Sequence, residues 1–243
     1  TQMSSTCCRA PASSAAGTED TGMMPVATGQ TASPRVQEAA KTLAAYLKAI
    51  TEAPFAVESG NGSTGLAVGT AADFPALPFL ADFDPQDPLR QEEYILRSHP
   101  KGVYLIGAAD IAVEHAVWDF LHRLGYRQFF PTEAWEVVPS CKDLSISVDT
   151  KETPSFHTRL LGYDYGYWDY NKSTFETWCA RNRVASALTI RCGHAYEGIV
   201  AANQAAFAAH PEYYGLYEGK RVSNKMCLSN PEVRKLIIDY ALT

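Results

Sequence analysis

Two segments with helical hydrophobic periodicity, separated by short apolar runs, constrain the fold of this chain most. The first begins at Ser33-Pro34, a typical helix start, and its apolar face is formed by Val36, Ala39, Ala40, Leu43, Leu47 and Ile50. The second is capped by Asp110 and ended by Gly125, and its apolar face is formed by Val113, Val117, Phe120, Leu121 and Leu124. Each helix therefore needs a flat apolar partner, which a β-sheet supplies.

The short apolar runs around these helices are predicted to form that sheet. Residues 55–57 and 66–69 are typical of short buried strands, and residues 94–96 and 103–106 flank a turn and indicate a β-hairpin. Residues 144–148 alternate with a period of two, as a half-buried strand does. Residues 70–91 contain four prolines and are predicted to be a surface loop. We predict an α/β domain over residues 34–150, a sheet with two long helices packed on it.

Residues 1–33 differ in composition from the rest. Of these residues, 20 are Ala, Ser, Thr or Gly and none is aromatic, so the segment offers little apolar surface to offset chain entropy. We predict a flexible leader over residues 1–33, in which the adjacent Cys7 and Cys8 are incidental. No intact signal peptide is visible, and a processed exported protein, extracellular or periplasmic, would have such a start.

Charge and cysteine content exclude several classes of protein. The formal net charge of −6 argues against a broad nucleic-acid surface, and no run of 18 apolar residues is present to span a membrane. Six cysteines are too few for a disulfide-built scaffold, although one pair, for example Cys192 and Cys227, could form in an exported protein. No phosphate-binding loop, nucleophile elbow or His-Glu-x-x-His motif occurs.

The last third of the chain has a different pattern, which begins after a polar stretch at residues 149–154. We place a domain boundary at residue 150. Strands are predicted at residues 156–162 and 185–191, with a helix from the capping box Ser173-x-x-Glu176 between them. A helix around residues 200–209, a short strand at 213–217 and a helix from Asn230 follow. Strand–helix–strand–helix order is typical of the start of a parallel α/β arrangement.

Three sets of motifs carry a resemblance to a known family. They are residues 39–51, residues 103–108 with 120–131, and GHAY at 193–196 with HPEYYGLYEGKR at 210–221 and CLSNPEV at 227–233. Together they resemble bacterial proteins that carry a domain of unknown function, DUF4838. The front half of those proteins is similar to the N-terminal domain of the α-glucuronidases of glycoside hydrolase family 67.

The resemblance implies a fold and a substrate class. It implies that the small α/β domain precedes a (β/α)8 (TIM) barrel and that the substrates are polysaccharides or their fragments. Such a barrel needs about 250 residues, whereas 89 remain from Ser155 to Thr243. We therefore expect residues 151–243 to be the first units of an incomplete barrel. The catalytic carboxylates implied by the resemblance lie on later strands, so this chain by itself is expected to be inactive.

An aromatic cluster follows the first predicted barrel strand, at the end where barrel active sites gather. It consists of Tyr163, Tyr165, Tyr167, Trp168 and Tyr170, with Asp164 beside it as a hydroxyl acceptor. Aromatic faces bury the apolar face of a sugar ring, so we predict carbohydrate contact here. The alternative is a packed aromatic loop.

Other candidate binding residues lie near the two predicted strand ends. His194 and Tyr196 follow the second strand, and a histidine there can bind a sugar hydroxyl or carboxylate or can hold a loop. Arg159 can grip a carboxylate, or it can form an ion pair between the barrel and the front domain. The pair Cys192-x-His194 is weak evidence for a metal, because structural zinc needs four ligands. We predict neither a metal nor a cofactor.

Two functions from different classes remain open. The first is part of a carbohydrate-active, glycoside hydrolase-like protein related in activity to α-glucuronidases, with a carbohydrate as partner. The second is a non-catalytic glycan-binding or cell-surface interaction module that uses the same aromatic loop. A purely structural α/β protein is a third, weaker reading.

Overall fold

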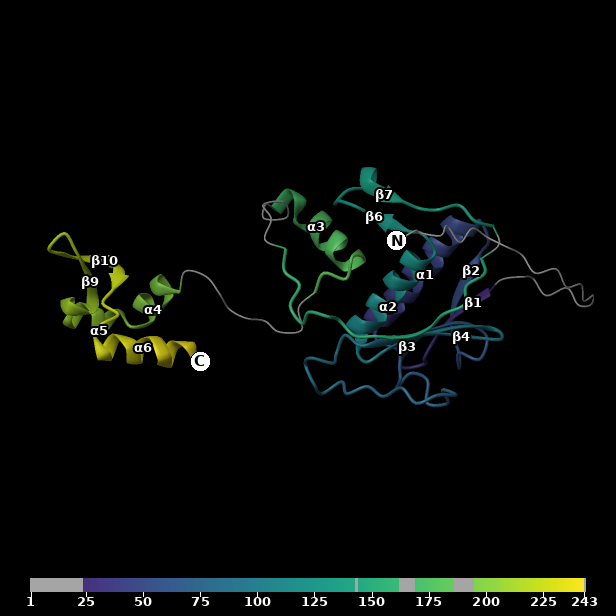
Figure 1. Ribbon diagram of the computed structural model, residues 1–243, viewed down its shortest axis with the longest axis horizontal. Coiled ribbons are helices and arrows are strands. Elements are labelled where there is room, and N and C mark those ends of the chain that lie inside the picture. Colours follow the sequence, from purple (N-terminus) through teal and green to yellow (C-terminus); the bar gives the residue numbers. More distant parts are fainter. Residues whose placement is uncertain (1–23, 143, 162–168, 186–194, 243) are drawn as a thin grey trace, which may run out of the picture. The chain divides into compact units, whose positions relative to one another are not determined.

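The chain divides into two compact units, Thr1–Leu188 and Thr189–Thr243 (Figure 1). The computed structural model describes residues 24–142, 144–161, 169–185 and 195–242. The predicted strand at residues 185–191 therefore lies, from residue 186 on, outside the described residues.

A six-stranded mixed sheet forms the centre of the first unit. Its strands are β1 (Met24–Thr28), β2 (Phe55–Ser59), β3 (Gly65–Thr70), β4 (Tyr94–His99), β5 (Gly102–Gly107) and β8 (Asp149–Glu152). They lie in the order β2-β1-β3-β5-β4-β8. The first four in this order are parallel, and β4 is antiparallel to both β5 and β8. The predicted α/β fold class and the predicted β4–β5 hairpin are confirmed.

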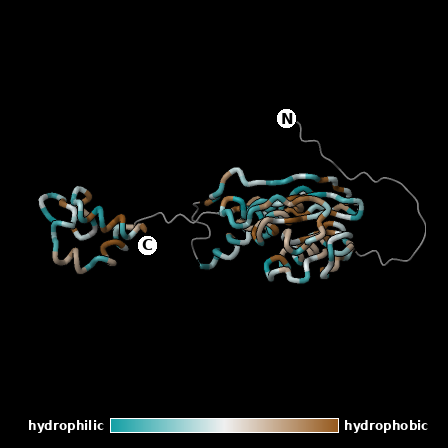
Figure 2. The backbone as a smooth tube through the Cα atoms, turned by 90° about the horizontal axis from the view of Figure 1, so that it is seen from below, coloured by the Kyte–Doolittle hydropathy of each residue, from teal (hydrophilic) through white to brown (hydrophobic). Residues whose placement is uncertain are grey.

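Two helices, α1 (Pro34–Thr51) and α2 (Asp110–Arg123), lie side by side on one face of this sheet (Figure 1). Their apolar faces and the inner face of the sheet form the main core, and apolar segments gather inside the unit in Figure 2. Ser33 caps α1 as predicted, because its Oγ accepts from the Val36 N–H at 3.2 Å. The cap position of α2 is Ala109 instead of the predicted Asp110, whose Oδ2 accepts from the Ser33 hydroxyl at 2.6 Å.

The predicted leader over residues 1–33 is wrong for its last part. Met24–Thr28 is a strand between β2 and β3, and Val26 within it is completely buried. The strand is short and its neighbours in the sequence are small residues, so it was not distinguished from the predicted leader. Pairing with a strand on each side stabilises it. β2, predicted to be buried, is instead an edge strand with an exposed second half. Residues 1–23 lie outside the described residues.

The predicted boundary at residue 150 falls inside β8. This strand is polar because it is the edge of the sheet, where side chains alternate between exposed and half-buried positions. Residues 144–148, predicted as a strand, are irregular, and the ladder begins only at Asp149. The chain after β8 stays within the first compact unit, which ends at Leu188.

A small hairpin and one helix complete the first unit. The hairpin pairs β6 (Arg127–Gln128) with β7 (Glu136–Val137) across the short 3-10 helix η1 (Glu133–Trp135). The helix α3 (Asp169–Arg181) packs on α2. The helix begins at Asp169, so the predicted capping box at Ser173 is wrong. Ser173 lies inside the helix, where its carbonyl accepts a hydrogen bond from the Thr177 hydroxyl.

The second unit has α4 (Tyr196–Ala202), α5 (Gln204–Ala209), the 3-10 helix η2 (Pro211–Tyr213), β9 (Tyr214–Tyr217), β10 (Lys220–Met226) and α6 (Pro231–Ala241). β9 and β10 form an antiparallel hairpin whose turn residues, Glu218 and Gly219, have positive φ. Asn230 caps α6 through its side-chain oxygen. Within residues 195–242 the strand pairing is antiparallel, so these residues contain no parallel barrel unit and the barrel stays a prediction.

Candidate functional site

The predicted site residues fall in three groups. Five of them lie outside the described residues: Tyr163, Asp164, Tyr167, Trp168 and His194. Tyr196 is the first residue of α4 in the second unit, with 42% of its surface exposed. Arg159 lies in the first unit, where several other residues contact it.

All three nitrogens of the Arg159 guanidinium have partners. Nε donates to the Arg183 carbonyl at 2.9 Å, and Nη1 donates to the Phe156 carbonyl at 2.6 Å. Nη2 forms a very close ion pair with Glu92 Oε2. Of the two predicted roles, the structure realises the ion pair to the front domain. These three contacts use three of the five N–H groups of the guanidinium.

Glu92 is the centre of a buried polar cluster just before β4. It is 2% exposed, and its Oε2 lies 3.3 Å from His115 Nδ1 on α2. Its Oε1 is buried without a hydrogen-bond partner among the described residues. Burial, followed by the charges of Arg159 and Arg183, lowers the pKa of His115 to about 3. His115 is therefore neutral at physiological pH and lies beside the Glu92 carboxylate.

Arg183 completes the cluster from a strained backbone position. The Val184 N–H donates to the Cys179 carbonyl and the Arg183 N–H to the Ala180 carbonyl, which is the pattern of a Schellman cap on α3. Arg183 has a φ of 57° at the position where glycine is usual. Its Nη1 donates to Tyr94 Oη at 2.9 Å and to Asp119 Oδ1 at 2.8 Å.

A cavity of about 320 Å³ opens beside this cluster, lined by Tyr94, His115, Glu152, Thr153, Pro154, Ser155, Arg159, Asn182 and Arg183. It lies at the carboxyl ends of the parallel strands, where open α/β sheets bind ligands. Its cations are paired with Glu92 and Asp119, so the charge around it is balanced. The cavity can hold a polar molecule by hydrogen bonds, but none of the described residues that line it is an activated nucleophile. Glu92 and Asp119 were missed from the sequence, although Asp119 was detectable as an acid within the buried face of a helix.

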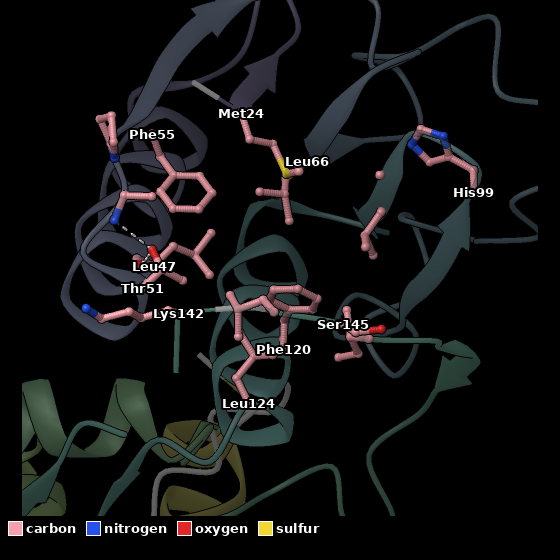
Figure 3. Close-up of a pocket in the computed structure, with 16 residues that line it drawn as sticks. Met24, Leu47, Thr51, Phe55, Leu66, His99, Phe120, Leu124, Lys142 and Ser145 are labelled. Atoms are coloured by element: carbon pink, nitrogen blue, oxygen red, sulfur yellow. Dashed lines mark hydrogen bonds between the residues drawn. The ribbon is translucent and has the colours of Figure 1, made fainter. Parts of the chain in front are cut away.

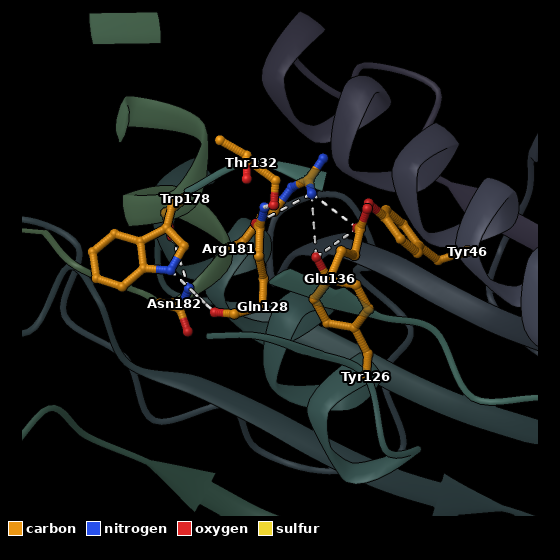
Figure 4. Close-up of polar contacts among 8 residues, drawn as sticks. All are labelled: Tyr46, Tyr126, Gln128, Thr132, Glu136, Trp178, Arg181 and Asn182. Atoms are coloured by element: carbon orange, nitrogen blue, oxygen red, sulfur yellow. Dashed lines mark hydrogen bonds and ion pairs between the residues drawn. The ribbon is translucent and has the colours of Figure 1, made fainter. Parts of the chain in front are cut away.

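A second cluster attaches α3 to the hairpin of β6 and β7 (Figure 4). Glu136 Oε1 accepts from the hydroxyls of Tyr46 and Tyr126, at 2.5 and 2.8 Å, and from Arg181 Nη1 at 2.9 Å. The Trp178 indole N–H and the Asn182 amide both donate to the Gln128 carbonyl. These contacts and those of Arg159 hold both sides of residues 162–168 on the front domain.

A larger cavity, of about 400 Å³, lies at the opposite, amino ends of the parallel strands (Figure 3). Met24, Phe55 and Leu66 of the sheet face Leu47 of α1 and Phe120 of α2 across it. Thr51, His99, Lys142 and Ser145 add polar groups at its edges. Of the predicted site residues that the structure describes, neither Arg159 nor Tyr196 lines it.

Cysteines and metal ligands were the remaining candidates for chemistry. Cys179 and Cys227 are free thiols, so the Cys192–Cys227 disulfide considered from the sequence is wrong. Cys141 is disulfide-bonded. The described residues contain no group of three or more His, Cys, Asp or Glu side chains that could hold a metal ion. Nor does a helix in the described part of the chain have the length and apolarity needed to cross a membrane.

Comparison with known proteins gives one family match. Residues 130–242 match the family model of a domain of unknown function, DUF4838, so the predicted resemblance to proteins with this domain is confirmed. Among solved structures, the chain is similar to a family GH115 4-O-methyl-α-glucuronidase with specificity for decorated arabinogalactans, at 13% sequence identity and a TM-score of 0.49. The likeness covers 67% of this chain but only 24% of that protein. No curated protein matches the chain.

Proposed function

We propose that this chain is part of a carbohydrate-active, glycoside hydrolase-like protein and contributes one side of a glycan-binding site. The proposal is supported by the aromatic cluster at residues 163–170, which lies inside the segment that matches DUF4838. It is also supported by the resemblance of the chain's motifs to proteins associated with α-glucuronidases. The partner is therefore a saccharide, and the described residues assist its binding.

The observation that carries the proposal is the double attachment of the aromatic segment. Arg159 precedes it and is held by Glu92, and α3 follows it and is held through Arg181 and Trp178. Binding residues work best when a rigid support holds them in place before the ligand arrives. Tyr170, the described member of the cluster, is 82% exposed in the first turn of α3, where its ring can stack on a sugar.

The described acidic residues favour binding over bond cleavage. Glycoside hydrolysis needs two carboxylates that face one bond. Glu92, Asp119 and Glu136 are instead each held by a guanidinium group. This observation favours the second candidate, a non-catalytic glycan-binding or cell-surface interaction module. A location outside the cytoplasm is proposed for either function and is supported by the disulfide at Cys141.

Glycan binding by the purified chain tests the proposal. We expect binding of acidic xylo-oligosaccharides or another glycan in calorimetry, weakened at least tenfold by Trp168→Ala and by Tyr170→Ala. Trp135→Ala is the matched control, because Trp135 is also an exposed aromatic residue but lies on η1, outside the cluster. The absence of any glycan ligand, or equal weakening by all three substitutions, would overturn the proposal.

A further inference from the structure

The cavity of about 320 Å³ at the carboxyl ends of the parallel strands has a wall of polar side chains that are held from behind. Arg159 and His115 line it, and both contact the buried carboxylate of Glu92. Arg183 lines it too, and its Nη1 donates to Asp119 Oδ1 at 2.8 Å. Side chains supported in this way keep their geometry before a ligand arrives, as a binding site requires.

The two arginines of the wall keep donors for a ligand. A guanidinium has five N–H groups. The hydrogen bonds of Arg159 to described residues use three of them, and those of Arg183, both from Nη1, use two. Within the described part of the chain, Nε and Nη2 of Arg183 therefore have no partner, although the side chain is only 33% exposed. Such donors favour a ligand that accepts hydrogen bonds.

The same wall also offers acceptors. Asn182 lines the cavity, and its Nδ2 donates to two backbone carbonyls, which leaves Oδ1 without a partner among the described residues. Glu152 accepts from Arg123 through Oε1, so its Oε2 can accept from a ligand. Ser155 adds a hydroxyl, which both donates and accepts. A ligand with several hydroxyl groups matches this mixed wall, because each hydroxyl also donates and accepts.

The charges around the cavity compensate one another. Each of the two lining arginines is paired with a buried carboxylate, and Glu152 is paired with the last residue of α2. His115 adds no charge at neutral pH, because burial lowers its pKa to about 3. A charged ligand would lose hydration and would find no uncompensated partner in the wall. The wall therefore favours an uncharged ligand over a carboxylate.

The backbone of Arg183 is an independent observation in favour of a ligand. Its φ of 57° lies in the left-handed region, at the end of α3, where glycine is usual. A long side chain is strained at such a position, and strain of this kind is concentrated at binding and catalytic sites. The strain is explained if the guanidinium has a role that glycine cannot fill.

We propose that this cavity binds one neutral polyhydroxylated unit and that the Arg183 guanidinium donates to its hydroxyl groups. The unit is a free sugar or polyol, or one residue of a longer glycan, and the cavity volume lies at the lower end of the range of about 300–1,000 Å³ for small-molecule sites. The inference deepens the proposed function and rests on it for the class of ligand. It adds a contact outside the aromatic cluster and a preference for uncharged sugars over uronates.

NMR of the arginine side chains tests the contact in the whole chain. The Nε–H signal of Arg183 is identified by its loss in Arg183→Gly, in which glycine suits the left-handed backbone and Asp119 keeps its pair with Arg123. We expect xylose, galactose or myo-inositol to shift this signal, and glucuronate to shift it only at higher concentration. A shift with neutral oligosaccharides alone would identify the unit as one residue of a longer glycan. No shift with any of these probes, or tighter binding of glucuronate, would overturn the proposal.

Calorimetry with the probe that shifts the signal measures the contribution of the guanidinium. Arg183→Gly is expected to weaken binding about tenfold, as the loss of a charged hydrogen-bond donor usually does. Glu52→Gly is the matched control, because Glu52 has the same left-handed backbone at the end of α1 but does not line the cavity. Ser155→Ala, which removes an exposed hydroxyl of the wall, is the second variant if circular dichroism shows that Arg183→Gly is unfolded. Equal binding by the wild type and the folded variant would overturn the proposal.

The same measurements with a neutral oligosaccharide separate this inference from the proposed function. Weaker binding in Trp168→Ala but not in Arg183→Gly would support the aromatic site and overturn the cavity site. Weaker binding in Arg183→Gly but not in Trp168→Ala would support the cavity site and contradict the aromatic site. Weaker binding in both variants would support one glycan that contacts both.

Discussion

Arg159 and Glu92 form an ion pair in which the carboxylate is buried, although 67 residues separate them in the sequence. The pair joins the segment after β8 to the residues just before β4. Its acid is 3% exposed at the side chain and its guanidinium 23% exposed. This contact explains why the front domain does not end at residue 150, because the chain beyond that residue supplies the counter-charge for a carboxylate of the domain.

Removing the arginine from this pair should destabilise the first unit. Arg159→Ala leaves Glu92 buried beside a neutral histidine, and breaking a buried pair from one side typically costs about 3–5 kcal/mol. We expect the free energy of unfolding of the first unit, measured by urea denaturation, to fall by an amount in this range. Arg97→Ala is the matched control, because its pair with Asp149 is largely exposed and should be worth less than about 1 kcal/mol.

Removing both charges of the pair should restore most of the stability that Arg159→Ala loses. In the double variant Glu92→Gln with Arg159→Met, no uncompensated charge remains in the cluster and the volume of the arginine stem is preserved. A double variant as unstable as Arg159→Ala would contradict this explanation and would indicate that the lost packing of the long side chain dominates.

His115 should make the first unit sensitive to acid. Its pKa is lowered to about 3 in the folded chain, below the value of about 6.5 expected when unfolded. The unfolded state therefore binds more protons between these values. Stability is complete above about pH 6.5 and is lost as the pH falls towards 3, with a slope of up to about 1.4 kcal/mol per pH unit.

Substitution of His115 measures its contribution to the acid sensitivity of the first unit. His115→Gln should reduce the pH dependence of the urea midpoint between pH 6.5 and 4. His122, whose pKa burial also lowers, to about 4, remains in that variant and gives a residual slope. An unchanged slope in His115→Gln would show that His115 does not cause the acid sensitivity.

The sequence predicted those elements whose signals are local. α1 was predicted from its apolar spacing and its Ser33 cap, and the hairpin of β4 and β5 from two apolar runs around a turn. The strands β1 and β8 were not predicted from the sequence. β1 is a central strand of only five residues and β8 is a polar edge strand, and both are stabilised by partners that are distant in the sequence. Such pairing leaves no local periodicity to detect.

In the candidate site too, the sequence indicated single residues but not their partners that are distant in the sequence. The sequence singled out Arg159 and named the ion pair as one of its two roles, but it could not identify Glu92 as the partner. Arg183 was missed because its role depends on a left-handed backbone position at the end of α3. That position became visible only when the end of the helix was known.

The attachment of α3 is expected to depend on Arg181. Arg181→Ala removes the cation that Glu136 shares with Tyr46 and Tyr126, and leaves that carboxylate with two hydroxyl donors. We expect faster hydrogen exchange of the α3 amides, by about tenfold for each 1.4 kcal/mol lost, with α1 unchanged. Thr177→Ala, on an exposed position of the same helix, is the control. Faster exchange throughout α1 as well would mean that the substitution unfolds the whole unit.

The chain is expected to show no glycosidase turnover. Glu92, Asp119 and Glu136 are each paired with an arginine, whereas glycoside hydrolysis needs two carboxylates that face one bond. Glu197, an acidic residue that is in none of these pairs, is exposed in the first turn of α4. Purified chain incubated with aryl glycosides and acidic xylo-oligosaccharides should release no sugar above the buffer rate. Turnover that Glu197→Gln abolishes would contradict this expectation and would locate a catalytic acid in the second unit.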